Sequence, residues 1–261
     1  MKRLRQVILF AAVIFALLAS AAAEVPQPGK NKVVVRGQQQ DVYFYPAAGN
    51  GAHRKILFAP GDGGWRGFAI TMAEKMAAAG YDVYGVDTRR YLQSFTGASV
   101  LQPGEIAADF RQMAQWAMQG SGQRVLFVGW SEGAGLGLVA AAAPGNRSVF
   151  DGAVAIGLPE YNILAWHWQD IAAELTKKMP NEPAFKSADY ISGVAPLPLA
   201  VIASAQDEYV SPKTTRALFA AAGKPKRLTV IEGGDHKYSG KNGEFFTALQ
   251  DSLNWIQQQL P

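Results

Sequence analysis

Short apolar runs alternate with helix-like segments along most of this chain. Runs rich in Val, Ile, Phe and Tyr and bounded by Gly, Pro or Asn are typical of strands. The predicted strands are 33–37, 41–45, 55–59, 81–86, 124–130, 150–156, 199–204 and 227–231. Segments with apolar residues at helical spacing, or with a continuous run of small apolar residues, predict helices. These predicted helices cover 68–79, 103–119, 132–143, 214–222 and 245–260.

The order of these elements predicts the fold class. Strands that alternate with helices favour an α/β fold, in which a mostly parallel central sheet has helices on both faces. The first two strands are joined by a polar turn, and we expect them to form an antiparallel hairpin at one edge. No internal repeat and no region of different amino-acid composition interrupts the alternation of strands and helices. Residues 24–261 are therefore expected to form a single domain.

Segment 157–193 is longer than a simple crossover requires. Apolar residues from Leu164 to Met179 follow helical spacing, and Pro180 breaks it. A segment inserted at the carboxyl end of the sheet could cover a site there, so we interpret it as a cap. The alternative is a long excursion that packs on the core.

The strand predicted at 124–130 runs directly into Gly129-Trp130-Ser131-Glu132-Gly133, a G-x-S-x-G pattern followed by a helix. This arrangement is typical of a nucleophile elbow, a sharp strand-to-helix turn that exposes a serine hydroxyl at the end of a sheet. The pattern alone is common in a glycine-rich chain, but the flanking strand and helix make it more specific. We therefore predict that Ser131 is a nucleophile.

A serine nucleophile needs a base and an acid that orients this base. Among the three histidines, His53 precedes a strand and His167 lies in the 157–193 segment, whereas His236 follows the last strand. His236 is therefore the predicted base. In the chain order Ser, Asp or Glu, His, the acid should follow the penultimate strand. Asp207 stands there and is the predicted acid, with Glu208 as the near alternative.

The developing oxyanion needs two backbone donors. One is expected from the N–H of Glu132, at the start of the helix after the serine. The other is expected from the glycine-rich loop 60–64 after the third strand, and we predict the N–H of Asp62, with Gly63 as the alternative. A plain glycine turn that caps the next helix is the competing interpretation.

The first 23 residues have the pattern of an export signal. A basic start precedes the apolar run Val7–Leu18, and Ala21-Ala22-Ala23 is typical of a cleavage site. We expect a periplasmic or secreted protein after cleavage near Ala23. The leader holds three of the 25 basic residues, which leaves 22 basic and 21 acidic residues and argues against a nucleic-acid partner.

The chain contains no cysteine. Thiol chemistry, disulfides and cysteine-based metal sites are therefore excluded. No group of histidines and carboxylates has the spacing of metal ligands, so neither a metal nor an organic cofactor is expected.

The elbow, the order of the three catalytic residues and the glycine-rich loop together resemble the α/β-hydrolase fold. A narrower resemblance rests on Gly61-Asp62-Gly63-Gly64-Trp65 and on the segment 85–91, GVDTRRY, which are similar to motifs of VirJ/AcvB-type bacterial virulence proteins. The elbow departs from that family, because Glu132 follows the serine where the family usually has Phe. The resemblance implies a periplasmic enzyme acting on aminoacyl esters of phosphatidylglycerol.

The sequence thus predicts an exported serine hydrolase that cleaves carboxylic esters. Trp65, Arg90 and Trp130 are expected to contact the substrate. Asp62 and Glu132 could face an ammonium group while Arg89 and Arg90 meet a phosphate, unless these charges are simply solvated at the mouth of a cleft. The alternatives are a dienelactone-hydrolase-like enzyme for small esters and a non-catalytic secretion accessory protein that keeps the fold. A lipid substrate at the membrane surface and the oligomeric state stay open.

Overall fold

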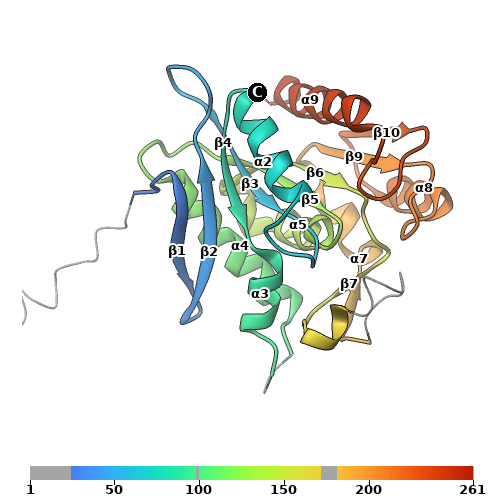
Figure 1. Cartoon of the computed structure of the whole chain (residues 1–261), viewed down its shortest axis with the longest axis horizontal. Coiled ribbons are helices and arrows are strands. Elements are labelled where there is room, and N and C mark those ends of the chain that lie inside the picture. The colour runs from blue at the N-terminus through green and yellow to red at the C-terminus, as the bar shows by residue number, and fades with distance from the viewer. Residues whose placement is uncertain (1–24, 98–99, 172–180, 261) are drawn as a thin grey trace, which may run out of the picture.

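A computed structural model describes residues 25–97, 100–171 and 181–260 of the chain (Figure 1). The leader predicted at 1–23 lies outside these residues. The main sheet has eight strands in the order β1-β2-β4-β3-β5-β6-β9-β10. Their bounds are β1 Gly29–Val35, β2 Gln38–Tyr45, β3 Arg54–Ala59, β4 Tyr81–Val86, β5 Val125–Trp130, β6 Phe150–Ile156, β9 Leu199–Ser204 and β10 Lys226–Ile231.

The strand directions confirm the predicted α/β class. Strand β2 pairs antiparallel with both β1 and β4, and the remaining neighbours, from β4 to β10, pair in parallel. The edge hairpin is also as predicted, but its first strand ends earlier. Arg36 and Gly37 have φ of 47° and 77° and form the turn between the paired residues Val35 and Gln38. A two-residue turn with both φ values positive matches the twist of a hairpin.

The helices lie where the periodicity predicts them, with ends shifted by a few residues. The long helices are α2 Phe68–Ala78, α4 Pro103–Met118, α5 Glu132–Ala142, α8 Pro212–Ala221 and α9 Asn242–Gln258. Thr88–Ser94 form a further short helix, α3, which was not among the predicted helices. Asp87 starts this helix because its carboxylate accepts a hydrogen bond from the backbone N–H of Arg90 at 3.1 Å.

Each face of the sheet has its own apolar core. Alternation along β3 shows the division: Ile56 and Phe58 pack with helices α2 and α9, whereas Leu57 and Ala59 pack with α4 and α5 on the other face. Figure 1 shows α2 in front of the sheet, with α9 beside it. Burial of apolar surface on both faces is what stabilises a cysteine-free domain of this size.

The described part of 157–193 corrects the start of the helix predicted from Leu164 onward, since residues 164–167 are not helical and Trp168–Asp170 form a 3-10 helix. This segment contains the strands β7 Tyr161–Ile163 and β8 Ala184–Lys186, which pair antiparallel, and the short helix α7 Ala188–Ile191. Leu164 is not helical because its backbone N–H donates to the carbonyl of Pro183 at 2.7 Å. The rest of the predicted helix, from residue 172 to Met179, lies outside the described residues.

The described residues contain no helix that is both long enough and apolar enough to cross a membrane.

Glycine at position 85 allows the indole of Trp65 to pack directly against strand β4. A Cβ atom on Gly85 of β4 would lie 1.7 Å from the indole of Trp65. We expect Gly85→Ala to lower the free energy of unfolding by about 1–3 kcal/mol, because the indole must move out of a packed position. Urea denaturation measures this change. Gly104→Ala is the matched control, since no atom lies within 4 Å of the Cβ it adds to helix α4. Equal transition midpoints for the two variants would contradict the prediction.

Candidate functional site

The order of the strands places a topological switch point next to the predicted nucleophile. From β3 the chain passes through α2 to β4 on one side, and it returns through α3 and α4 to β5 on the other side of β3. Ligands of open α/β sheets bind at the carboxyl ends of strands where the connections diverge in this way. The loop after β3 and the elbow after β5 therefore meet at this point, because Ala59 and Gly129 pair in register.

Ser131 occupies the strained conformation that a nucleophile elbow requires. Its backbone has φ 55° and ψ −125°, a region that non-glycine residues rarely adopt. The turn is tight enough that a Cβ on Gly129 would lie 2.4 Å from the carbonyl oxygen of Gly133. A Cβ on Gly133 would lie 2.0 Å from the carbonyl oxygen of Ala59. Both glycines of the pattern are thus needed for the approach of backbone to backbone.

The predicted base and the predicted acid are in direct contact. Nδ1 of His236 lies 2.7 Å from Oδ2 of Asp207, and both side chains are buried. The second oxygen of Asp207 accepts the backbone N–H groups of Tyr209 and Val210 at 2.8 and 2.9 Å. Glu208, the alternative acid, instead accepts the backbone N–H of His236 at 2.8 Å. The two carboxylates therefore hold the ring and the backbone of one histidine.

The other ring nitrogen of His236 is unused within the described structure. Nε2 is buried and forms no hydrogen bond there. Buried polar atoms are nearly always paired, so this nitrogen needs an explanation, and a role as the predicted base supplies one.

Contacts with β6 bring the histidine loop beside the elbow. The backbone N–H of Ser131 donates to the carbonyl of Ile156 at 2.8 Å. The next residue, Gly157, has φ 54°, and a Cβ on it would lie 2.8 Å from Cε1 of His236. The indole N–H of Trp130 donates to the carbonyl of His236 at 3.2 Å. Ser131 and His236 thus pack against the same strand end.

The predicted oxyanion donors flank the serine. A Cβ on Gly61 would lie 3.1 Å from Cβ and 3.5 Å from Oγ of Ser131, so the backbone of this loop borders the hydroxyl. The carbonyl of Gly61 accepts the N–H of Gly64 at 3.0 Å. In a trans peptide the C=O and the following N–H point in opposite directions, so the N–H of Asp62 points out of this turn. Glu132 is the first residue of α5, where N–H groups have no partner within the helix.

The side chain of Glu132 is buried beside these donors. Burial raises the pKa of its carboxyl well above the ordinary value, and the negative charge of Asp62 raises it further. A hydrogen bond from the backbone N–H of Ile163 acts in the opposite direction. One carboxyl oxygen, Oε1, is buried without a hydrogen bond to the described residues. The surroundings of Glu132 therefore favour the protonated form of its carboxyl.

The three residues predicted to contact the substrate have different surroundings. Trp130 is 9% exposed and holds the histidine loop. Trp65 stacks on Tyr43, with ring centroids 5.0 Å apart. Arg90 is exposed and lies over β2, where its Nε is 3.4 Å from the carbonyl of Gln39. Because β2 is three strands from β5, Arg90 is about 14 Å from the elbow along the sheet. Substrate contacts of all three stay predictions.

The described residues contain one group that could hold a metal ion. The side chains of His167, Asp170 and Glu182 offer one ligand atom each, all within 4.8 Å of one another. These atoms already bond within the cluster. Nδ1 of His167 pairs with the carboxylate of Glu182, and Asp170 accepts the backbone N–H of His167 at 2.6 Å. The cluster thus has a structural explanation that requires no ion.

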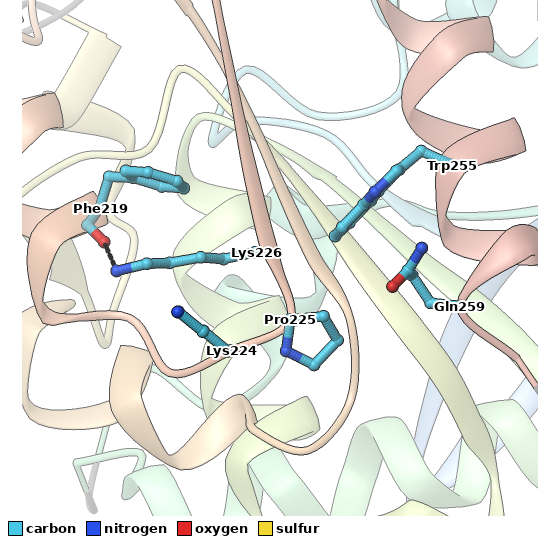
Figure 2. A pocket seen from close by; sticks show the side chains of 6 residues that line it. All are labelled: Phe219, Lys224, Pro225, Lys226, Trp255 and Gln259. Carbon is cyan, nitrogen blue, oxygen red and sulfur yellow. Dashed lines mark hydrogen bonds between the residues drawn. The ribbon is translucent and has the colours of Figure 1, made fainter.

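An open recess of about 650 Å³ lies far from these catalytic groups. Figure 2 shows Phe219, Trp255 and Lys226 on its walls, with the ammonium of Lys226 bonded to the carbonyl of Phe219. Lys226 begins β10, so the recess is at the amino-terminal end of the parallel strands. Ser131, Asp207 and His236, the predicted catalytic residues, stand at the opposite end.

Solved structures share this architecture. Est1E from Butyrivibrio proteoclasticus aligns with a TM-score of 0.64 at 13% identity, covering 88% of this chain and 98% of that one. A dienelactone hydrolase from Anabaena variabilis aligns with a TM-score of 0.63 at 20% identity, covering 91% of this chain and 100% of that one. The protein has the α/β-hydrolase fold.

Sequence comparison adds a narrower likeness. Residues 54–144 match the family described as bacterial virulence protein (VirJ), which confirms the VirJ-like resemblance. Protein Rv2307c of Mycobacterium tuberculosis is 28% identical over 231 residues, which cover 83% of this chain and 75% of that protein. The VirJ match includes the glycine-rich loop and Ser131 but ends before Asp207 and His236.

Two residues beside the histidine were not predicted from the sequence. The backbone of Gly157 leaves room for the imidazole, and the ring of Tyr209 meets it edge-on with centroids 5.1 Å apart. A glycine directly after the buried strand β6 was the available signal for the first. Tyr209 lies in a polar loop, where its sequence surroundings give no comparable signal.

The raised pKa of the buried Glu132 carboxyl makes the stability of the protein depend on pH. The folded state retains a proton that the unfolded state releases above the ordinary pKa of 4.5, so this contribution is fully present below that value. We expect stability to fall as pH rises from there through the raised pKa, by at most about 1.4 kcal/mol per pH unit. Denaturation midpoints measured across pH should decline less steeply for Glu132→Gln. Parallel profiles for the parent and the variant would refute the prediction.

Proposed function

We propose that this protein is a serine hydrolase that cleaves carboxylic esters. The observation that carries the proposal is the pairing of His236 with Asp207 while the buried Nε2 stays unbonded beside the elbow. A neutral imidazole held in this way accepts a proton at Nε2 only, which is what activation of a serine hydroxyl requires. The likeness to esterases and dienelactone hydrolases supports the same class of reaction.

In the proposed mechanism, Oγ of Ser131 attacks the ester carbonyl as Nε2 of His236 takes the hydroxyl proton. Asp207 stabilises the resulting imidazolium through Nδ1–H. The N–H groups of Asp62 and Glu132 bind the oxyanion of the tetrahedral intermediate. His236 then gives its proton to the leaving alcohol, and an acyl-enzyme on Ser131 remains. Water, deprotonated by the same histidine, attacks the acyl-enzyme and releases the acid.

Covalent labelling with a fluorophosphonate probe tests for the activated serine. We expect residues 24–261 to be labelled and Ser131→Ala to remain unlabelled. If the parent folds and is not labelled by the probe or acylated by any ester tested, the non-catalytic accessory role replaces the proposal.

Exchange of Asp207 for Asn tests the orienting acid. We expect Asp207→Asn to reduce kcat on p-nitrophenyl acetate by about 10⁴-fold, because the amide favours the wrong imidazole tautomer. Glu208→Gln is the matched variant, since it alters the carboxylate that contacts the backbone of His236 rather than its ring. A larger loss for Glu208→Gln would reverse the two assignments.

We further propose that the substrate is an aminoacyl ester of a phospholipid and that the protein meets it after export to the periplasm. The VirJ-like segment supports this class, as do two acidic side chains, Asp62 and Glu132, at the oxyanion loop. An incoming ammonium would allow the carboxyl of Glu132 to ionise and form a charge-assisted hydrogen bond. Arg90, over β2, would meet only a part of the substrate remote from the ester.

A selectivity ratio tests this substrate class. The ratio is kcat/KM on aminoacyl-phosphatidylglycerol divided by kcat/KM on p-nitrophenyl acetate. We expect Glu132→Gln to lower it by about 10-fold or more, because one charged hydrogen bond contributes about 1.5–3 kcal/mol. A constant ratio would favour the alternative enzyme for small neutral esters.

A further inference from the structure

Arg89 connects the oxyanion loop to the 157–193 segment. It lies in helix α3, and its Nε donates a hydrogen bond to the carbonyl of Asp62 at 3.0 Å. The guanidinium carbon of the same side chain lies 4.5 Å from the ring centroid of Trp166. One planar cation therefore bonds to the backbone of the loop and stacks on an indole of the segment.

The bond from Arg89 completes the fixation of the backbone around Asp62. On one side, the carbonyl of Gly61 is held by the N–H of Gly64. On the other side, the carbonyl of Asp62 is held by Arg89. The carbonyl of Gly61 shares a peptide plane with the N–H of Asp62, and the carbonyl of Asp62 shares one with the N–H of Gly63, the alternative donor. The two bonds therefore fix the directions of both candidate donors. An oxyanion donor stabilises the transition state only if it is oriented before the reaction.

The indole beneath Arg89 is itself part of the packed core. Trp166 is 4% exposed, and its backbone N–H donates to Oγ1 of Thr96 at 2.9 Å. Two positions before it, Leu164 is bonded to Pro183 and is buried. We call residues 161–166 the support segment. Hydrogen bonds to Thr96 and to Pro183, which lie on opposite sides of it in the sequence, hold this segment in place.

A second contact joins the support segment to the elbow. The backbone N–H of Ile163 donates to the carboxyl of Glu132, whose own N–H is the other predicted oxyanion donor. The neighbouring side chain, Asn162, is completely buried against α5, where a Cβ on Gly135 would lie 1.8 Å from its Oδ1. Each of the two donor residues is therefore tied to the same short segment.

We propose that the support segment is a fixed support of the oxyanion hole and that Arg89, held by Trp166, is a positioning residue acting through the carbonyl of Asp62. The inference rests on the proposed hydrolase function and adds a role for Arg89 that differs from contact with a substrate phosphate. Loss of Arg89 would leave the triad and the substrate site in place, while the oxyanion loop loses the bond that fixes the peptide between Asp62 and Gly63. The transition state would therefore lose more stabilisation than the bound substrate would.

Kinetics on p-nitrophenyl acetate test this role. We expect Arg89→Met to lower kcat by about 10- to 100-fold, within the range for a weakened oxyanion donor, with KM changed less than about twofold. Arg89→Lys should recover part of kcat, because an ammonium can reach one carbonyl but cannot stack as a plane. Trp166→Leu should lower kcat in the same direction. The double variant should lose less than the product of the two single losses, because the residues act as a unit.

Arg124→Met is the matched control. Arg124 also bonds a backbone carbonyl, that of Arg147 at 3.3 Å, but it lies at the amino-terminal end of the sheet. Its replacement should leave kcat within about twofold. A rise in KM with constant kcat for Arg89→Met would assign Arg89 to substrate binding instead, and independent losses in the double variant would refute the link to Trp166.

Hydrogen–deuterium exchange separates this inference from the proposed function. Faster exchange is expected in peptides covering 60–66 and 161–166 of Arg89→Met, with no change in either region of Arg124→Met. If the parent shows no turnover that depends on Ser131, the hydrolase function fails and the exchange result alone decides whether Arg89 fixes the loop. Unchanged exchange in both regions would overturn the inference whatever the activity.

Discussion

The site depends on one steric constraint, the contact of backbone with backbone where the elbow after β5 meets the end of β3. Gly133 approaches the carbonyl of Ala59 so closely that no side chain fits between them, and Gly61 approaches Ser131 from the other side. These contacts force the positive φ of Ser131 and keep its hydroxyl at the surface of the turn. The two cores on either face of the sheet hold the strained turn in place, since local strain persists only where the surroundings over-determine it.

Buried polar groups around this turn divide into structural and reactive sets. Asp207 and Glu208 satisfy the backbone and one ring nitrogen of His236, so the loop is rigid while a single nitrogen stays open. Glu132 is different, because its burial raises the pKa of its carboxyl and so favours the protonated form. In the proposed mechanism, this reduces the negative charge beside Ser131 until a cationic group of the substrate arrives.

Much of this arrangement follows from local sequence signals. Alternating apolar runs identified every strand of the main sheet, and Leu199–Ser204 was predicted with its observed bounds. The elbow, Asp207 and His236 could be located because each follows a strand end in chain order. The backbone conformation at Leu164 and Trp166 could not be predicted in this way. Helical spacing of apolar residues does not reveal that Leu164 pairs with Pro183, which is distant in sequence. The role of Arg89 likewise depends on tertiary contact, because a surface arginine and a bridging arginine look alike in sequence.

The last part of the chain contributes both to the core and to the candidate site, and this affects the order in which they are completed. Helix α9 supplies Phe245, Leu249 and Ile256 to the core shared with α2, and the loop before it carries His236. A growing chain thus acquires Ser131 long before it acquires His236 or the helix that completes this core. If the proposed mechanism holds, the serine gains its base only when folding is complete, so an unfinished chain would carry a serine that is not yet activated.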